Sequence, residues 1–383
     1  MSKWEEKKLE DIIAVNPAVK LTKGESYPFI DIDRVESKNK SVTNFGERVF
    51  DGQGGSRFQD GDTLFSRITP CLENRKIAMA KISGSGTGFG STEFYVFRNK
   101  NGLSDRDFVY YLVSSDWVVL PAINSMTGAS GRQRADRRFI ERLKIKFPDL
   151  PTQIRIAEIL SAYDDLIENN NRRIDLLEKL AQDLYKEWFV RFRFPGHEKV
   201  KFVNGLPEGW SRENFRGNIK YITGKLDSNE MVVDGPYSFY TCAKTVYKTN
   251  TFCFDGECVL LGGNNATGDF SLFYANGKLN AYQRTYIVTP ISDRLSCPYI
   301  YFVLKDYLQI FKTASTGAAT KFLTKKMLDN FHIIIPLQEL SDEYKRVATT
   351  LFNEMVNLQS KNQNLTRQRD MLLPRLMSGK LEV

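Results

Sequence analysis

Two long stretches of the chain carry apolar residues at alternating steps of four and three, the pattern of a heptad seam on an α-helix. The first stretch begins at Pro151, whose missing N–H would have no partner in a first helical turn. No further glycine or proline occurs before Pro195. We therefore predict a long helix over residues 151–195. Its seam positions are Ile156, Leu160, Tyr163, Ile167, Asn170, Ile174, Leu177, Ala181, Leu184 and Trp188.

The second stretch covers residues 338–383, where a helix followed by a short tail is predicted. Pro374 is expected to kink or terminate this helix. Two such helices in one chain most simply pack on each other as an antiparallel coiled coil, and a generic dimerisation element is the alternative. Asn170 and Asn362 near the seam centres either fix the register of the pair or face solvent. The second seam consists of Tyr344, Ala348, Leu351, Met355, Leu358, Asn362, Leu365, Arg369, Leu372 and Leu376.

A β-rich stretch with glycine-rich turns precedes each helix, and the two stretches share landmarks in the same order. A Trp with an apolar residue five positions on opens each one, as Trp4 to Leu9 and Trp210 to Phe215. Each also contains a Thr-Gly pair and then a strand-like run ending in proline. These are Thr127-Gly128 with Leu143 to Pro151, and Thr316-Gly317 with Phe331 to Leu337. The chain is thus predicted to hold two copies of one globular unit, each followed by a long helix.

Short runs of apolar residues predict the elements inside each unit. In the first, strands are expected at Tyr27 to Ile32, Thr63 to Ile68, Lys76 to Ile82 and Glu93 to Arg98, with a helix over Asp107 to Leu120. In the second, strands are expected at Pro236 to Tyr240, Cys258 to Gly263 and Arg284 to Val288, with a helix over Pro298 to Phe311.

Composition favours a polyanion as partner and argues against several classes of chemistry. The net charge is +8, with 54 Lys and Arg against 46 Asp and Glu in 383 residues, a balance that suits a phosphate backbone. The five cysteines include no CxxC pair and the chain has two histidines, so neither a structural metal nor a Ser/His/Asp mechanism is expected. No phosphate loop is present. With no apolar stretch near about 18 residues and no signal core, we expect a non-catalytic cytoplasmic protein.

Basic residues gather after the first Thr-Gly pair, where arginine could hold phosphates or read guanine edges. Asn and Gln in the second unit could pair with adenine, although any one of these side chains is more simply a structural surface residue. The candidate DNA-binding residues are Arg67, Arg75, Lys76, Arg132, Arg134, Asn264, Asn265, Gln283, Arg284, Lys321 and Lys325.

The chain resembles the specificity (S) subunit of type I restriction–modification systems over nearly its whole length. The segments that carry the resemblance are "LPTQIRIAEIL" at Leu150 to Leu160, "LYKEWFVRF" at Leu184 to Phe192, "LPEGW" at Leu206 to Trp210 and "LLPRLMSGKLEV" at Leu372 to Val383. The chain departs from the family pattern before Trp4, where the usual Leu-Pro-x-Gly is missing. It also departs at the second helix, which lacks the Pro and Gln found in the first.

The resemblance implies an α+β fold with two mixed α/β target-recognition domains separated by an antiparallel coiled coil of two long helices. The domains would be residues 1–150 and 196–337, and the spacer helices 151–195 and 338–383. It further implies that each domain reads one half of a split duplex DNA target, and that the helices set the spacer. Two adenine methyltransferase subunits and ATP-dependent endonuclease/translocase subunits would dock on the chain. S-adenosylmethionine, ATP and Mg would bind in those partners, and no cofactor in this chain. A coiled-coil scaffold or protein-interaction module is the alternative.

Overall fold

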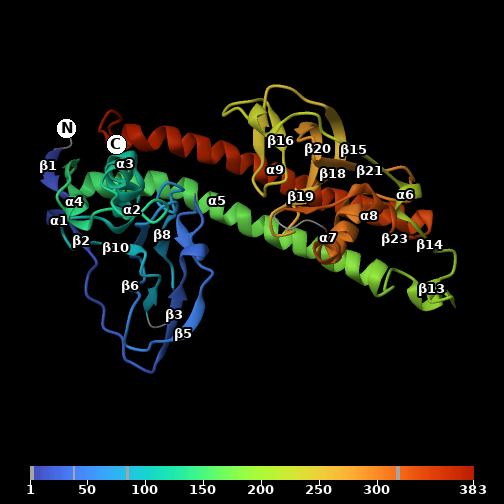
Figure 1. Ribbon diagram of the computed structural model, residues 1–383, viewed down its shortest axis with the longest axis horizontal. Helices are drawn as coiled ribbons and strands as arrows, with labels where there is room; N and C mark the ends of the chain where they lie inside the picture. The colour runs from blue at the N-terminus through green and yellow to red at the C-terminus, as the bar shows by residue number, and fades with distance from the viewer. Residues whose placement is uncertain (1–3, 38, 83–85, 316–319) are drawn as a thin grey trace. The chain divides into compact units, whose positions relative to one another are not determined.

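The chain divides into two compact units, and both long helices contribute to each of them. The computed structural model describes residues 4–37, 39–82, 86–315 and 320–383. The first unit contains the described residues up to Asn169 together with Asn362–Val383, and the second contains Asn170–Lys361. Figure 1 follows the chain by colour, with the first long helix in green and the second in red.

The first unit is built on a five-stranded sheet in the order β2-β10-β7-β8-β4 and a four-stranded sheet in the order β5-β3-β9-β6. A two-stranded ladder of β1 and β11 completes its strands. The bounds are β1 Glu5–Lys8, β2 Ile13–Val15, β3 Ser26–Ile30, β4 Ser41–Val42, β5 Gly46–Val49, β6 Ser56–Gln59, β7 Thr63–Ser66, β8 Ile77–Ala80, β9 Thr87–Gly90, β10 Phe94–Asn99 and β11 Lys144–Phe147.

Four short helices lie among these strands, and their bounds are α1 Leu9–Ile12, α2 Arg106–Ser114, α3 Asp116–Asn124 and α4 Arg137–Glu141. The side chain of Asp105 accepts a hydrogen bond from the Phe108 amide and so caps α2. The single helix expected over residues 107–120 is wrong, because Ser115 has extended backbone and separates α2 from α3.

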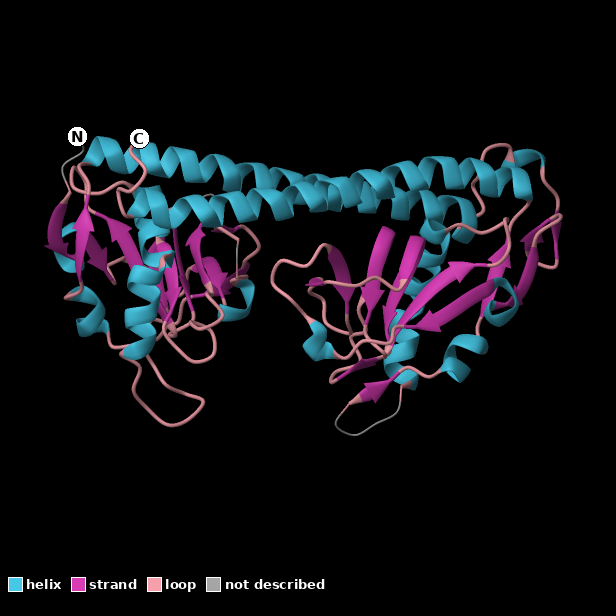
Figure 2. Ribbon diagram, turned by 90° about the horizontal axis from the view of Figure 1, so that it is seen from above, coloured by secondary structure: helices cyan, strands magenta, loops and turns pink. Residues whose placement is uncertain are grey.

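The second unit is built on a six-stranded sheet in the order β15-β21-β18-β20-β16-β17, with two-stranded ladders of β12 with β13, β14 with β23, and β19 with β22. In both units the strands pack with helices (Figure 2). Its strands are β12 Phe202–Val203, β13 Leu206–Pro207, β14 Ser211–Asn214, β15 Ile219–Thr223, β16 Tyr237–Tyr240, β17 Tyr247–Thr249, β18 Phe254–Gly262, β19 Asn264–Asn265, β20 Leu272–Ala281, β21 Thr285–Pro290, β22 Lys321–Phe322 and β23 His332–Ile335. Its short helices are α6 Phe215–Asn218, α7 Cys297–Ala314 and α8 Lys325–Asp329.

The strand registers of the two units coincide, so the duplication inferred from the sequence extends to individual residue pairs. Glu5 pairs with Phe147 between β1 and β11, and Ser211 pairs with Ile335 between β14 and β23. Phe94 of β10 pairs with Ser66, as Thr285 of β21 pairs with Gly262. A residue in one unit therefore has an identifiable counterpart in the other. The second Thr-Gly pair, Thr316-Gly317, lies outside the described residues.

The two long helices are α5, Leu150–Tyr185, and α9, Gln338–Met377. A π-helical turn over Lys186–Val190 extends α5, so the helix ends before the predicted residue 195. There the chain turns away at Phe192, whose φ is 57° and whose ring packs on Trp210 at 5.6 Å between centroids. Helix α9 continues through Pro374, contrary to expectation. Burial of Leu376 and Met377 in the core of the first unit outweighs the hydrogen bond that proline removes.

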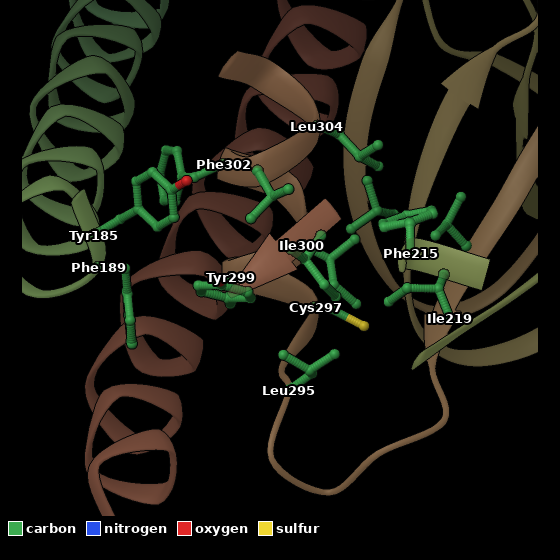
Figure 3. Packing of buried hydrophobic residues seen from close by; sticks show 14 of the residues in the cluster. Tyr185, Phe189, Phe215, Ile219, Leu295, Cys297, Tyr299, Ile300, Phe302 and Leu304 are labelled. Carbon is green, nitrogen blue, oxygen red and sulfur yellow. The ribbon is translucent and has the colours of Figure 1, made fainter. Parts of the chain in front are cut away.

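In the second unit the packing between the long helices and α7 is aromatic. Tyr185 stacks on Phe302 at 5.5 Å between ring centroids, and Phe189 meets Tyr299 edge to face at 4.8 Å. In Figure 3 the Tyr185 ring of α5 points toward Phe302 of α7. Tyr344 of α9 packs on Phe189 at 4.8 Å. Burial of large rings in such contacts stabilises the unit through both apolar area and edge-to-face geometry.

In the first unit, the corresponding contact between α2, α5 and α9 is made by polar side chains. Asp164 of α5 is 6% exposed and forms an ion pair with Arg369 of α9. The hydroxyl of Tyr111 on α2 donates to the other oxygen of Asp164 at 2.5 Å. Burial lowers the pKa of the Arg369 guanidinium, but the carboxylates of Asp164 and Asp370 together raise it above its usual range, so the side chain stays charged.

The counterparts of Tyr111, Asp164 and Arg369 in the second unit are apolar: Phe302, Phe352 and Ala181, all in its hydrophobic core. The helix pair is antiparallel within each unit. In the first unit, Asn362 hydrogen-bonds to the Ile167 carbonyl and Arg369 hydrogen-bonds to Asp164, so the residue numbers run in opposite directions. In the second unit, Arg173 forms an ion pair with Glu354.

Replacing Arg369 with alanine should destabilise the first unit by about 3–5 kcal/mol, because Asp164 would remain buried without its cation. The combined change Tyr111→Phe, Asp164→Phe and Arg369→Ala copies the second unit and should recover most of that loss. Thermal unfolding of the full chain, with hydrogen exchange of the α5 amides, measures both. A single variant as stable as the original would contradict this account.

Candidate nucleic-acid interface

In the first unit, three segments distant in sequence meet at the end of β7. The Arg67 amide donates to the carbonyl of Glu93 at 2.9 Å, and the Ala135 amide donates to the carbonyl of Arg67 at 2.8 Å. The backbone amides of Thr127 and Arg134 each donate to the other's carbonyl across the loop that contains the Thr-Gly pair. The loop is therefore fixed beside the start of β10 by main-chain hydrogen bonds, which hold its side chains in place.

Glu93 lies between two of the candidate arginines. Its carboxylate accepts from Nε and Nη2 of Arg134 at 2.9 and 2.6 Å, and from Nε of Arg67 at 3.2 Å. The Arg67 guanidinium also lies 5.4 Å from the centre of the Tyr95 ring. Hydrogen bonds from Arg134 hold the pKa of Glu93 below its usual range despite partial burial. The cluster joins two cations to one anion and keeps one net positive charge at neutral pH.

The equivalent place in the second unit has the same main-chain frame. The Gly263 amide donates to the carbonyl of Arg284 at 2.7 Å, and the Leu323 amide donates to the carbonyl of Gly263 at 2.9 Å. The hydroxyl of Tyr286 donates to the Leu323 carbonyl at 3.0 Å, as that of Tyr95 donates to Ala135 at 2.7 Å. The three segments are therefore joined by the same main-chain hydrogen bonds in both units.

The side chains on that frame differ between the units. Arg284 takes the place of Glu93, Gly263 that of Arg67, and Phe322 that of Arg134. The Arg284 guanidinium lies 5.5 Å from the centre of the Phe322 ring, a cation–π contact. The second unit therefore presents a cation on an aromatic face where the first presents two arginines around a carboxylate.

Residues 1–179 and 208–367 match the type I restriction modification DNA specificity domain family. The chain belongs to this family. It is 31% identical over 180 residues to the type I restriction enzyme EcoDI specificity subunit of Escherichia coli, a match that spans 46% of this chain and 39% of that protein. It is 24% identical over 319 residues, 75% of this chain and 72% of the relative, to the type I restriction enzyme MjaIX specificity subunit of Methanocaldococcus jannaschii.

The fold is that of a specificity subunit. The crystal structure of the type I restriction-modification system S subunit from M. genitalium superposes with a TM-score of 0.58 at 16% identity, covering 98% of this chain and 96% of that one. The α+β architecture expected from the sequence, with two recognition domains and two long helices, is thereby confirmed.

The remaining candidates of the first unit do not all join the cluster around Glu93. Arg132 is an exposed neighbour in the same loop, and its carbonyl lies 3.5 Å from Nη1 of Arg134. Arg75 instead binds the Ser114 carbonyl at 3.0 Å and the Asp116 carboxylate. Lys76 donates to the Ile32 carbonyl at 3.1 Å. Arg75 and Lys76 therefore connect parts of the first unit, which agrees with the structural role that the sequence analysis kept as the alternative.

In the second unit, Asn264 and Asn265 form β19 and pair with Phe322 and Lys321 of β22. The Asn264 Oδ1 is buried without a hydrogen-bond partner among the described residues. The Asn265 Oδ1 accepts from the Thr267 and Asp269 amides, so it stabilises a turn.

Gln283 and Arg284 are exposed at the start of β21. Lys325 begins α8 with its ammonium 5.9 Å from the centre of the Tyr221 ring. Gln283, Arg284 and Lys325 thus add to the polar surface near β19 and β22, while no contact in the described structure shows which of them meets DNA.

Glu93, Tyr95 and Phe322 belong to these clusters, and the sequence analysis did not select them as site residues. Nothing about Glu93 alone distinguishes it from other strand-edge carboxylates. The one available signal is internal: aligning "EFYVF" at Glu93 with "RTYIV" at Arg284 matches Glu93 with a residue already chosen as a candidate.

The predicted coiled-coil positions are buried or half-buried along both helices. Ile156, Leu160 and Asn170 are buried in α5, and Leu358 is buried in α9. The half-buried remainder of the proposed set is Ile167, Ile174, Leu177, Leu351, Asn362 and Leu365. Asn362 donates to the Ile167 carbonyl at 3.5 Å, which favours a role in the helix contact over a solvent-facing side chain.

Across the described residues, no group of three or more His, Cys, Asp and Glu side chains is arranged to hold a metal ion. No helix in the described ranges is long and apolar enough to cross a membrane.

Replacing Tyr95 with phenylalanine should loosen the Thr-Gly loop, because the Ala135 carbonyl would stay buried without its donor, at a cost of about 1–3 kcal/mol. The Thr127 and Arg134 amides should then exchange hydrogen faster. Tyr286→Phe is the matched control and should leave those amides unchanged while loosening the strand that begins at Lys321. Equal exchange in both variants would show that the hydroxyls do not hold these loops.

Proposed function

We propose that this chain is the DNA-reading subunit of a type I restriction–modification enzyme and that each unit reads one part of a two-part duplex target. The observation that carries the proposal is a pair of main-chain frames with matching registers and different side chains at matching positions. Two modules that share a docking geometry but differ in their contact residues are what a bipartite target requires, because side chains at base edges carry the sequence information.

In this proposal the chain performs no chemistry itself. Adenine methyltransferase subunits that bind S-adenosylmethionine, and endonuclease/translocase subunits that use ATP and Mg, would dock on it, and the long helices would set the number of unread base pairs. The relatives are specificity subunits of restriction enzymes, which supports such an assembly. A protein that reads cellular DNA in this way would work in the cytoplasm.

The test is to express the full chain with the methyltransferase subunit of its host and to map methylated adenines across the genome. We expect methylation at a target of two short defined parts with unspecified bases between them. If the subunits bind each other but no methylated sequence emerges, the chain is a scaffold and the proposal is wrong.

Exchanging residues 10–145 for the matching region of another family member should change one part of the methylated target and leave the other part as it was. The expectation follows because both frames are complete without each other's strands. The reciprocal exchange in the second unit is the control and should change the other part. A change in both parts from a single exchange would mean that the units do not read independently.

Binding of the full chain to duplex DNA should weaken steeply as salt rises, because arginine and lysine contacts to phosphates release counterions. Arg132→Ala should reduce the slope of log affinity against log salt by about one if that side chain meets a phosphate. Arg75→Ala is the control, because Arg75 is already bound within the unit. Fluorescence anisotropy over a salt series measures both, and an unchanged slope for Arg132→Ala would remove it from the interface.

A further inference from the structure

We propose that Glu93 is a positioning residue that directs the Arg67 guanidinium at a guanine in the target part read by the first unit. This inference rests on the function proposed above and adds the base and the residue pair that would read it. It concerns Glu93, Arg67 and Arg134, whose contacts leave each guanidinium with a different set of unused donors.

Arg67 keeps the donor pair that guanine recognition needs. Its Nε is bound to Glu93 and one face of the guanidinium lies near the Tyr95 ring. Its two terminal nitrogens, Nη1 and Nη2, have no hydrogen-bond partner among the described residues, and the side chain is 30% exposed. Two parallel N–H groups on one edge match the O6 and N7 acceptors of guanine in the major groove. Holding the opposite edge reduces the conformational freedom that binding would otherwise remove.

Arg134 uses more of its N–H groups within the protein than Arg67 does. Both Nε and Nη2 are bound to Glu93, and Nη1 lies 3.5 Å from the Arg132 carbonyl. Three of its five N–H groups are therefore engaged within the protein, against one of five in Arg67, so Arg134 has fewer donors left for a base. Its charge offsets that of Glu93, so a carboxylate can stand at a surface that faces phosphates without net repulsion.

The second unit has no carboxylate-bound arginine at the positions that correspond to Glu93 and Arg67. Gly263 stands where Arg67 does and has no side chain to aim, and Arg284 replaces the carboxylate. The Glu93–Arg67 arrangement is thus a property of the first unit alone, and its loss should affect one part of the target only.

The experiment selects bound sequences from a pool of duplexes with randomised positions, using the full chain. The original chain should enrich a two-part sequence with guanine at a defined position in one part. Glu93→Gln should lower the preference for that guanine about ten-fold and leave the other part unchanged. Arg67→Lys keeps the charge but lacks the paired donors, so it should lose the guanine preference while retaining most of the affinity.

Arg132→Ala is the matched control from the same loop, since its side chain does not contact Glu93 in the described structure. It should weaken binding without altering base preference. An unchanged guanine preference in both Glu93→Gln and Arg67→Lys would overturn the inference and leave the proposed function standing. If the original chain enriches no sequence at all, the proposed function itself fails. Should Glu93→Gln not fold, as judged by its thermal unfolding, the Arg67→Lys result decides.

Discussion

Burial of the seam along α5 and α9 determines where the other elements of the chain can lie. Each unit takes one stretch of each helix into its own core: Ile156 and Leu376 belong to the core of the first unit, and Trp188 and Tyr344 to that of the second. Neither core is complete with only one helix. The sheets are held to this helical support by α2 and α7, and the clusters around Glu93 and Arg284 lie at the ends of strands of those sheets.

Periodicity was sufficient to predict the long helices, because it follows from burying one face of a regular element. Short apolar runs predicted individual strands, and the landmarks shared by the two halves predicted the duplication. The ends of the elements were less predictable, since they depend on tertiary contacts. Helix α9 passes Pro374 because two buried residues beyond it anchor the last turn. The missing glutamine at the start of the second helix is replaced in function: Ser341 donates to the Arg294 carbonyl at 2.6 Å, as Gln153 donates to the Leu103 carbonyl at 3.2 Å.

Individual site residues could not be assigned from the sequence, because their partners come from remote segments. Arg67 and Arg75 both lie in the segment that joins β7 to β8, yet one is bound to Glu93 and the other to Asp116. Asn264 and Asn265 are adjacent, but only the latter has its side-chain oxygen occupied by a turn. Charge and residue type therefore selected a region, and the fold determines which of its side chains are already bound within the protein.

The buried ion pair in the first unit also bears on which helices can associate. If α5 paired with a second copy of itself in the same antiparallel register, Asp164 would face Ala181 instead of Arg369. If α9 did the same, Arg369 would face Phe352. The α5 pairing buries the Asp164 carboxylate without its cation, which is strongly unfavourable. The α9 pairing leaves Arg369 with the Asp370 carboxylate of its own helix and without Asp164. The Asp164–Arg369 pair thus disfavours self-association of the helices and favours joining the two unlike helices of one chain.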